Sequence, residues 1–185
     1  MADALTFMRK GALVPDSTVW DVVRERGLCL RCRGGFILDG FPRTLSQAAA
    51  LRGLMEHEKV PLNAVVSYEL PLPEIVERLS GRRTCEKCKA IYHIAQQPPQ
   101  AEGVCDRCGS RLYQREDDRS ESITVRMEAY ERNTAPLIEF YKDLGLLLSV
   151  PAVSSPADIC ARTVSALQAR LAGKTAEVKR VGQSF

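Results

Sequence analysis

Two Cys-x-x-Cys pairs constrain the fold of this chain more than any other feature of its sequence. Cys85 and Cys88 form the first pair, and Cys105 and Cys108 form the second after sixteen intervening residues. Two pairs at this separation can bring four thiolates from two turns to one tetrahedral site, the geometry of structural zinc. Because four cysteines leave no open coordination position, we expect a structural metal and not a catalytic one. The alternative is a pair of reducible dithiols without metal.

The remaining cysteines and the histidine nearest to them carry weaker signals. Seven cysteines in a chain without a recognisable export signal favour metal or redox chemistry over disulfides. Cys29 and Cys32 have the same spacing but no second pair near them. We interpret both, together with Cys160, as small buried or incidental thiols. We expect no metal role for His93, because the two pairs already complete a zinc shell.

Apolar runs and helical spacings alternate along the chain, with one interruption. Short apolar runs predict buried strands over residues 35–41, 64–70 and 146–150. From residue 84 to about 114 the periodicity stops, and proline and glycine punctuate a cysteine-bearing insert. Strands separated by helices predict a mostly parallel α/β sheet, with the insert as a second, small domain. The predicted helices span residues 16–27, 47–55, 75–79, 120–141 and 155–171.

The composition is that of an ordinary globular protein. Hydrophobic residues make up 45% and charged residues 26%, which argues against a disordered or fibrous chain. The longest apolar run, residues 144–153, is interrupted by Ser149 and Pro151, so we expect no membrane span and a cytoplasmic location. The net charge of +3 is too small to indicate nucleic-acid binding, although arginine, which suits phosphate, supplies 19 of the 26 cationic residues.

Several motifs together resemble the adenylate kinase family. The most specific is Asp-Gly-Phe-Pro-Arg-Thr at residues 39–44, which Gln47 follows. The resemblance covers residues 1–171 approximately, with residues 1–10 similar to a helix of the AMP-binding region. The other motifs, in the family's order, are Gly-Ala-Leu-Val-Pro-Asp at 11–16, Gly-Arg-Arg at 81–83, the four paired cysteines, Tyr-Gln-Arg-Glu-Asp-Asp at 113–118, Thr-Val-Arg at 124–126 and Thr-Ala-Pro-Leu at 134–137.

The resemblance implies a fold and a division into domains. The implied fold is α/β, with a P-loop-NTPase-like parallel sheet, helices on both of its faces, and a small zinc-binding LID domain. The implied parts are a partial CORE with the remaining half of the AMP-binding region at residues 1–81, the LID at 82–118, the C-terminal part of the CORE at 119–173 and a flexible tail at 174–185.

The resemblance also implies which residues bind nucleotides. Phosphoryl transfer depends on positioning and charge neutralisation, so several arginines are expected to converge on phosphates. The implied catalytic residues are Arg43, Arg82, Arg115 and Arg126, with Asp39 ordering the shell of the magnesium that accompanies ATP. The residues implied for AMP are Ala12, Leu13, Val14, Gly40, Phe41, Pro42, Arg43, Gln47, Arg115 and Arg126, and those implied for ATP are Arg78, Arg82, Ile91 and Tyr92.

The chain departs from the family at the phosphate-binding loop. Adenylate kinases begin with a strand and a loop of the form G-x-x-x-x-G-K-[ST], and these 185 residues contain no such run. The one Gly-Lys-Thr, at residues 173–175, lacks the upstream glycine and follows a predicted helix instead of opening one. We therefore expect little or no transfer activity from this chain alone. Without the family's first strand, unpaired backbone groups would be costly, which leaves three alternatives: the neighbouring strands shift together, a partner chain supplies a strand, or the chain is an incomplete product.

Three functional hypotheses follow from these features. The first is an adenylate kinase that converts ATP and AMP into two ADP molecules. The second is a non-catalytic nucleotide-binding or regulatory fragment. The third is a zinc-ribbon module that binds nucleic acid, with which the cysteine spacing and a pI near 8.5 are compatible, but we expect no nucleic-acid partner. A salt-dependent affinity for DNA or RNA would favour the third hypothesis.

Overall fold

The computed structural model describes residues 2–27 and 35–181. These residues divide into two compact units, and each unit takes two separate stretches of the chain. The first draws on Met1–Cys29 and Pro71–Asn133, and the second draws on Leu30–Leu70 and Thr134–Phe185. The predictions for Cys29 and Cys32 lie outside the described residues. Among the described helices, none has the length and apolar character that a membrane crossing requires.

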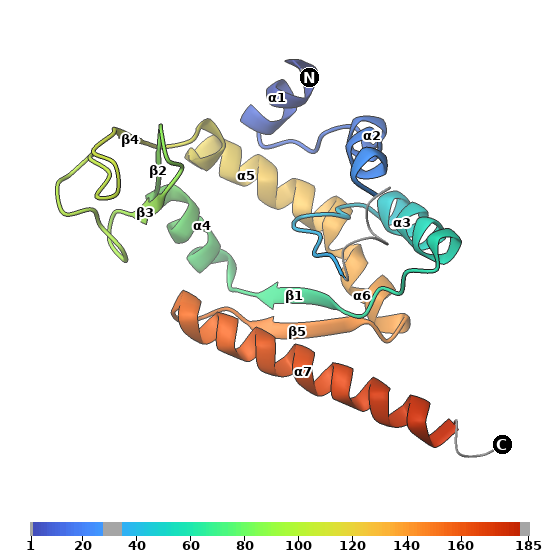
Figure 1. The fold of residues 1–185 in the computed structure, drawn as a ribbon. Coiled ribbons are helices and arrows are strands. Elements are labelled where there is room, and N and C mark those ends of the chain that lie inside the picture. Colours follow the sequence, from blue (N-terminus) through green and yellow to red (C-terminus); the bar gives the residue numbers. More distant parts are fainter. Residues whose placement is uncertain (1, 28–34, 182–185) are drawn as a thin grey trace. The chain divides into compact units, whose positions relative to one another are not determined.

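The first unit contains the cysteine-bearing insert and the helices that flank it (Figure 1). Its three strands form an antiparallel sheet in the order β3-β2-β4. Helix α4 ends at Gly81 and β2 begins at the next residue, so the insert continues directly from the helix. The elements are α1 (Ala2–Arg9), α2 (Asp16–Gly27), α4 (Leu72–Gly81), β2 (Arg82–Cys85), β3 (Ile91–His93), β4 (Leu112–Tyr113), the 3-10 helix η2 (Glu116–Asp118) and α5 (Ser120–Ala129).

The second unit is built on two parallel strands. Strands β1 and β5 pair in parallel from Val65 opposite Leu147 to Glu69 opposite Pro151, and α7 packs along β5 (Figure 1). Helices α3 and α6 contact each other, and the buried side chains between them are apolar. The elements are α3 (Leu45–Glu58), β1 (Val65–Glu69), α6 (Pro136–Asp143), β5 (Leu147–Pro151) and α7 (Pro156–Val181).

The structure confirms a parallel α/β arrangement but corrects one predicted strand. The strands predicted over residues 64–70 and 146–150 are β1 and β5. The run at residues 35–41 is not a strand: residues 35–38 have no regular secondary structure, and Ile37 is 95% exposed. A strand is stabilised by its neighbours, and among the described residues β1 pairs only with β5. The apolar run does not pair with the remaining edge of β1, and without a strand partner it stays irregular.

The long helix predicted from residue 120 to 141 is also wrong in one respect, because it is interrupted. Helix α5 ends at Ala129, a π-helical turn, η3 (Tyr130–Thr134), follows, and α6 begins at Pro136. Proline has no backbone N–H, so it fits the first turn of a new helix better than the interior of a continuous one. Gly145, with a φ of +62°, follows the end of α6 as predicted. Helix α7 continues to Val181 and so includes residues 174–181 of the expected tail.

Candidate functional site

The four paired cysteines of the insert lie together, as their spacing predicts. Their Sγ atoms all lie within 4.8 Å of one another, with 3.5 Å between those of Cys85 and Cys108 and 3.5 Å between those of Cys88 and Cys105. A tetrahedron with zinc–sulfur bonds of about 2.3 Å has sulfur–sulfur edges of about 3.8 Å. All four are free thiols. The donor set and its size therefore fit one structural zinc ion; this group of residues is the cysteine cluster.

The two halves of the cysteine cluster use the same backbone turn. Four residues after the first cysteine of each pair, the backbone is left-handed: φ is +60° at Lys89 and +69° at Gly109. The N–H of Lys89 donates to the carbonyl of Cys85 at 3.2 Å, and the N–H of Gly109 donates to that of Cys105 at 2.8 Å. Each turn reverses the chain so that both sulfurs of its pair face the same point. Local turn chemistry thus brings the ligands together.

Hydrogen bonds within the cysteine cluster favour the thiolate at two positions, Cys105 and Cys108. At Cys88 the backbone hydrogen bond of Ala90 lowers the pKa, but burial and hydrogen bonds from the other three cysteines outweigh it and raise the pKa to about 11. Hydrogen bonds from the side chain and then the backbone of Ser110 lower the pKa of Cys108 to about 6. The phenol of Tyr92, whose oxygen is 3.5 Å from the Sγ of Cys105, is the main cause of a lowered pKa at Cys105. The same oxygen accepts from the backbone N–H of Asp106 at 3.0 Å. Because zinc binds thiolates and not thiols, these contacts prepare the site for a metal.

Three arginines implied for catalysis converge on two adjacent carboxylates in the first unit. Arg82 donates to both oxygens of Asp118, at 2.8 and 2.5 Å. Arg115 does the same with Asp117, at 2.8 and 2.7 Å. Arg126 donates from Nη1 to both acids at 3.4 Å. These five residues, the arginine–aspartate cluster, come from β2, from the residues around η2 and from α5.

The arginine–aspartate cluster is an electropositive site with partly accessible guanidinium groups. Three guanidinium groups outnumber two carboxylates, and the side chains of Arg82, Arg115 and Arg126 are 23%, 40% and 30% exposed. Burial is the largest single influence on Asp117 and opposes its ionisation, but the hydrogen bond and charge of Arg115 together with the charge of Arg126 lower its pKa overall. Burial lowers the pKa of Arg126. The excess positive charge suits an anionic group such as phosphate.

We expect Asp118→Asn to destabilise the first unit strongly. Asp118 is completely buried, and its charge balances Arg82 and Arg126. Removing one partner of a buried ion pair costs about 3–5 kcal/mol, because the remaining charge is left uncompensated. Chemical denaturation of the metal-loaded chain measures the loss. Asp117→Asn is the matched control: its side chain is 14% exposed and its partner Arg115 is 40% exposed, so its cost should be clearly smaller. Equal losses in both variants would contradict this account.

The first predicted AMP segment begins beside Arg126. Gly11 is buried with a φ of +73°, and a Cβ there would lie 2.6 Å from the carbonyl oxygen of Ser122 and 2.8 Å from Cγ of Arg126. Only glycine permits this approach of the backbone to α5. The residues that follow, Ala12, Leu13 and Val14, are half-buried. The structure therefore brings this segment to the arginine–aspartate cluster within one unit.

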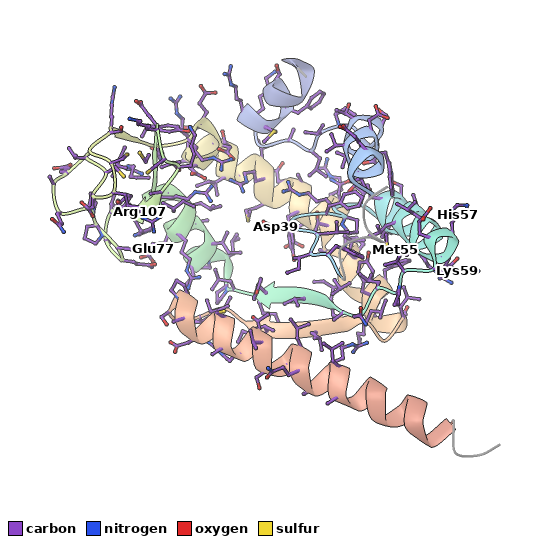
Figure 2. The ribbon with its side chains drawn as sticks, in the orientation of Figure 1. Asp39, Met55, His57, Lys59, Glu77 and Arg107 are labelled. Carbon is purple, nitrogen blue, oxygen red and sulfur yellow. The ribbon has the colours of Figure 1, made fainter. Side chains whose placement is uncertain are left out.

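The second predicted AMP segment lies in the second unit, on the loop before α3, where Asp39 is exposed (Figure 2). Nε of Arg43 donates to the carbonyl of Gly40 at 2.7 Å, and a Cβ on Gly40 would lie 2.9 Å from Nη2 of Arg43. Thr44 caps α3 by accepting from the N–H of Gln47 at 3.2 Å, while Oε1 of Gln47 accepts from the N–H of Arg43 at 2.7 Å. These reciprocal bonds fix the loop at the helix start.

The remaining predicted nucleotide contacts belong to the first unit. Arg78 on α4 lies 3.8 Å from Glu74. Ile91 is 62% exposed, whereas Tyr92 is 7% exposed and directs its phenol to Cys105. Cys160, interpreted as a buried or incidental thiol, is exposed.

The sequence interpretation missed the role of two acids. Asp117 and Asp118 were part of a motif, but not as partners of the arginines. The signal that could have indicated this pairing is the position of the two adjacent acids, directly after Arg115 and Glu116.

Comparison with known proteins gives the family. The adenylate kinase family model matches residues 2–146. The adenylate kinase of Caldicellulosiruptor saccharolyticus is 44% identical over 164 residues, which are 89% of this chain and 76% of that protein. The adenylate kinase of Streptomyces griseus is 42% identical over 90% of this chain and 76% of that protein, and the enzyme of Archaeoglobus fulgidus is 45% identical over 80% and 68%. These matches identify a nucleoside monophosphate kinase, a phosphotransferase.

More narrowly, the chain belongs to the adenylate kinase family. The α/β fold with a parallel strand pair, and the cysteine cluster that could hold zinc, agree with this assignment. The substrates of the family are ATP, AMP and ADP, and its members use magnesium with ATP.

Proposed function

We propose that this chain binds ATP and AMP through its arginines and supports the transfer of a phosphoryl group between them. The arginine–aspartate cluster is the observation that supports this proposal. It fixes three guanidinium groups by six hydrogen bonds to the side chains of two carboxylates, so each group is oriented before a ligand arrives. Phosphoryl transfer requires such positioned positive charge more than it requires covalent chemistry from the protein. Arg82, Arg115 and Arg126 would hold the phosphate oxygens.

The other nucleotide contacts are proposals of the same kind. Arg43 would bind the AMP phosphate and Gln47 the adenine, since a guanidinium suits phosphate and an amide suits a base edge. Asp39 would order the water shell of magnesium. Gly40, Phe41 and Pro42 in the second unit, and Ala12, Leu13 and Val14 in the first, would each contribute to AMP binding. Arg78, Ile91 and Tyr92 would contribute to ATP binding together with Arg82.

We also propose that the cysteine cluster holds one structural zinc ion per chain. Cys85, Cys88, Cys105 and Cys108 would be the four ligands, leaving no coordination position for water or substrate. When bound, the metal would cross-link two turns of the LID segment (residues 82–118), which has few apolar side chains of its own. The lowered pKa values of Cys105 and Cys108 support this role.

We expect only weak transfer activity from the 185-residue chain by itself, because it contains no phosphate-binding loop motif. A partner chain that supplies a strand and such a loop would complete the site. The 95% exposure of Ile37 and the single strand partner of β1 among the described residues support this proposal. A non-catalytic nucleotide-binding role is the second candidate, favoured by the same missing motif. A cytoplasmic location and the absence of a nucleic-acid partner remain expectations.

Titration calorimetry with a bisubstrate analogue, two adenosines joined through five phosphates, tests the proposed binding. We expect the zinc-loaded chain to bind it, and Arg126→Ala to raise the Kd by about 10- to 100-fold through loss of charge-assisted hydrogen bonds. Arg132→Ala is the matched control, because Arg132 is exposed and lies outside the arginine–aspartate cluster. Absence of binding to folded, zinc-loaded protein, or equal weakening by both substitutions, would contradict the proposal.

A further inference from the structure

Both ring nitrogens of His93 make contacts with the backbone. His93 is the last residue of β3 and is half-buried. Its Nδ1 lies 3.1 Å from the backbone nitrogen of Ala95 and 3.0 Å from that of Gln96. Its Nε2 lies 3.2 Å from the carbonyl oxygen of Glu77, a residue of α4 (Figure 2). One imidazole thus joins the end of a LID strand to the preceding helix.

These partners determine which tautomer of the ring fits the structure. A backbone N–H can only donate, so Nδ1 must accept from Ala95 and Gln96 and therefore carries no proton. The Glu77 carbonyl can only accept, so Nε2 must donate to it. The tautomer that fits these contacts therefore carries its proton on Nε2. The two nitrogens have separate tasks: Nδ1 holds the turn after β3, and Nε2 holds α4.

Gly81 is what allows the ring to sit at the end of α4. A Cβ on Gly81 would lie 2.1 Å from Nε2, 2.5 Å from Cε1 and 2.8 Å from Cδ2 of His93. These distances are far shorter than any stable contact, so no larger residue fits beneath the ring. The backbone of Gly81 is additionally held by the N–H of Ile94, which donates to its carbonyl at 3.0 Å. Here the glycine is required by space alone.

The LID segment supplies the C-terminal cap of α4. The last carbonyls of a helix have no partner within it, and in α4 they accept from LID donors. The N–H of Ile94 donates to Gly81, and Nη1 of Arg83 and Nε2 of Gln114 each donate to the carbonyl of Ser80 at 3.0 Å. His93 adds a contact one turn earlier, at Glu77. Arg82 leaves the helix at this point and pairs with His93 in the β2–β3 ladder. The backbone position of Arg82 therefore depends on this joint between the LID segment and α4, while its guanidinium is held by Asp118.

We propose that His93, seated on Gly81, is a positioning residue that fixes the exit of the chain from α4 and so holds Arg82 in its phosphate-binding direction. The role of Arg82 rests on the proposed function; the joint between His93 and α4 does not. The two ring nitrogens contribute differently. The Nε2–H bond to α4 sets Arg82, and the Nδ1 contacts order the turn at Ala95 and Gln96.

Two substitutions separate the tasks of the two nitrogens. In His93→Asn, the amide oxygen can replace Nδ1 but the side chain is too short to reach Glu77; in His93→Gln, the amide nitrogen can replace Nε2. We expect the Kd for the bisubstrate analogue to rise about tenfold in His93→Asn and His93→Ala, and His93→Gln to restore it to within about threefold. Amide hydrogen exchange at Ala95 and Gln96 should follow the Nδ1 contacts instead. It should accelerate about tenfold in His93→Gln and His93→Ala, and should not change in His93→Asn.

A double-mutant cycle that combines Gly81→Ala with His93→Ala completes the test. The Cβ added in Gly81→Ala should displace the ring, so this variant should behave like His93→Ala, while adding Gly81→Ala to His93→Ala should cost little more. Strong non-additivity supports the joint. Any of three results would overturn the proposal: additive effects of the two substitutions, failure of His93→Gln to restore affinity, or hydrogen exchange at Ala95 and Gln96 that no variant changes. If the unmodified chain does not bind the analogue, the proposed function fails. The joint is still tested by hydrogen exchange and by the double-mutant cycle, in which chemical denaturation then measures the free energy of unfolding.

Discussion

Removal of zinc from the purified chain is expected to unfold the LID segment while the helices of the second unit remain folded. The buried core of the segment consists of Cys85, Ala90, Tyr92, Cys105 and Leu112, so two of its five members are proposed zinc ligands. Segments below about 40 residues seldom fold on an apolar core alone. Structural zinc supplies an apparent binding free energy of about 10–16 kcal/mol in small zinc domains, more than such a core could replace.

Hydrogen exchange measured by mass spectrometry, before and after a strong chelator, follows this change segment by segment. Residues 82–118 should lose protection on chelation and recover it when zinc is restored. Cys88→Ser should abolish zinc binding, whereas Cys160→Ser should leave it intact, and both residues are exposed free thiols in the starting protein. Unchanged protection of the LID segment after complete zinc removal would show that its fold does not depend on the metal.

The second large effect concerns catalysis. We expect the 185-residue chain to transfer phosphoryl groups at least about 10³-fold more slowly than a full-length relative such as the Streptomyces griseus enzyme, since loss of transition-state charge stabilisation typically costs this much. The one Gly-Lys-Thr run, at residues 173–175, lies inside α7. Its backbone N–H groups belong to helical hydrogen bonds and so do not form a phosphate-cradling loop.

A coupled assay for ADP, run on zinc-loaded protein, measures the rate directly. Co-expression with a segment that carries a strand and a phosphate-binding loop, like those with which adenylate kinases begin, should raise the rate. The same segment with the loop lysine replaced by alanine is the control, because it keeps the strand and removes the charge. Turnover at the rate of the relative from the chain alone would overturn this prediction.

The cysteine cluster shows what local sequence can predict about this fold. The cluster follows from spacing because each half is a tight turn over five residues, and the turns at Lys89 and Gly109 need no distant partner. Likewise, α2 coincides with the predicted helix over residues 16–27. Helices and turns satisfy their own backbone hydrogen bonds, so their signals are contained within the sequence of the element.

The failed predictions concern partners that are distant in sequence. The run at residues 35–41 is as apolar as β1, but a strand forms only where another strand pairs with it, and local composition does not specify that neighbour. The bond between Arg82 and Asp118 spans 36 positions. His93 was considered only as a metal ligand, and its seat on Gly81 depends on a close approach that no periodicity indicates.

The ion pair between Arg82 and Asp118 also has a consequence for how the sequence of the LID segment can diverge in evolution. These residues are the first and last of the LID segment, and their side chains are in direct contact. An inserted piece whose two ends lie together can vary in length or content without altering the path of the chain outside it. The stretch between them is therefore suited to exchange as a cassette, in natural divergence or in engineered chimaeras, provided that the arginine and the aspartate at its ends are kept.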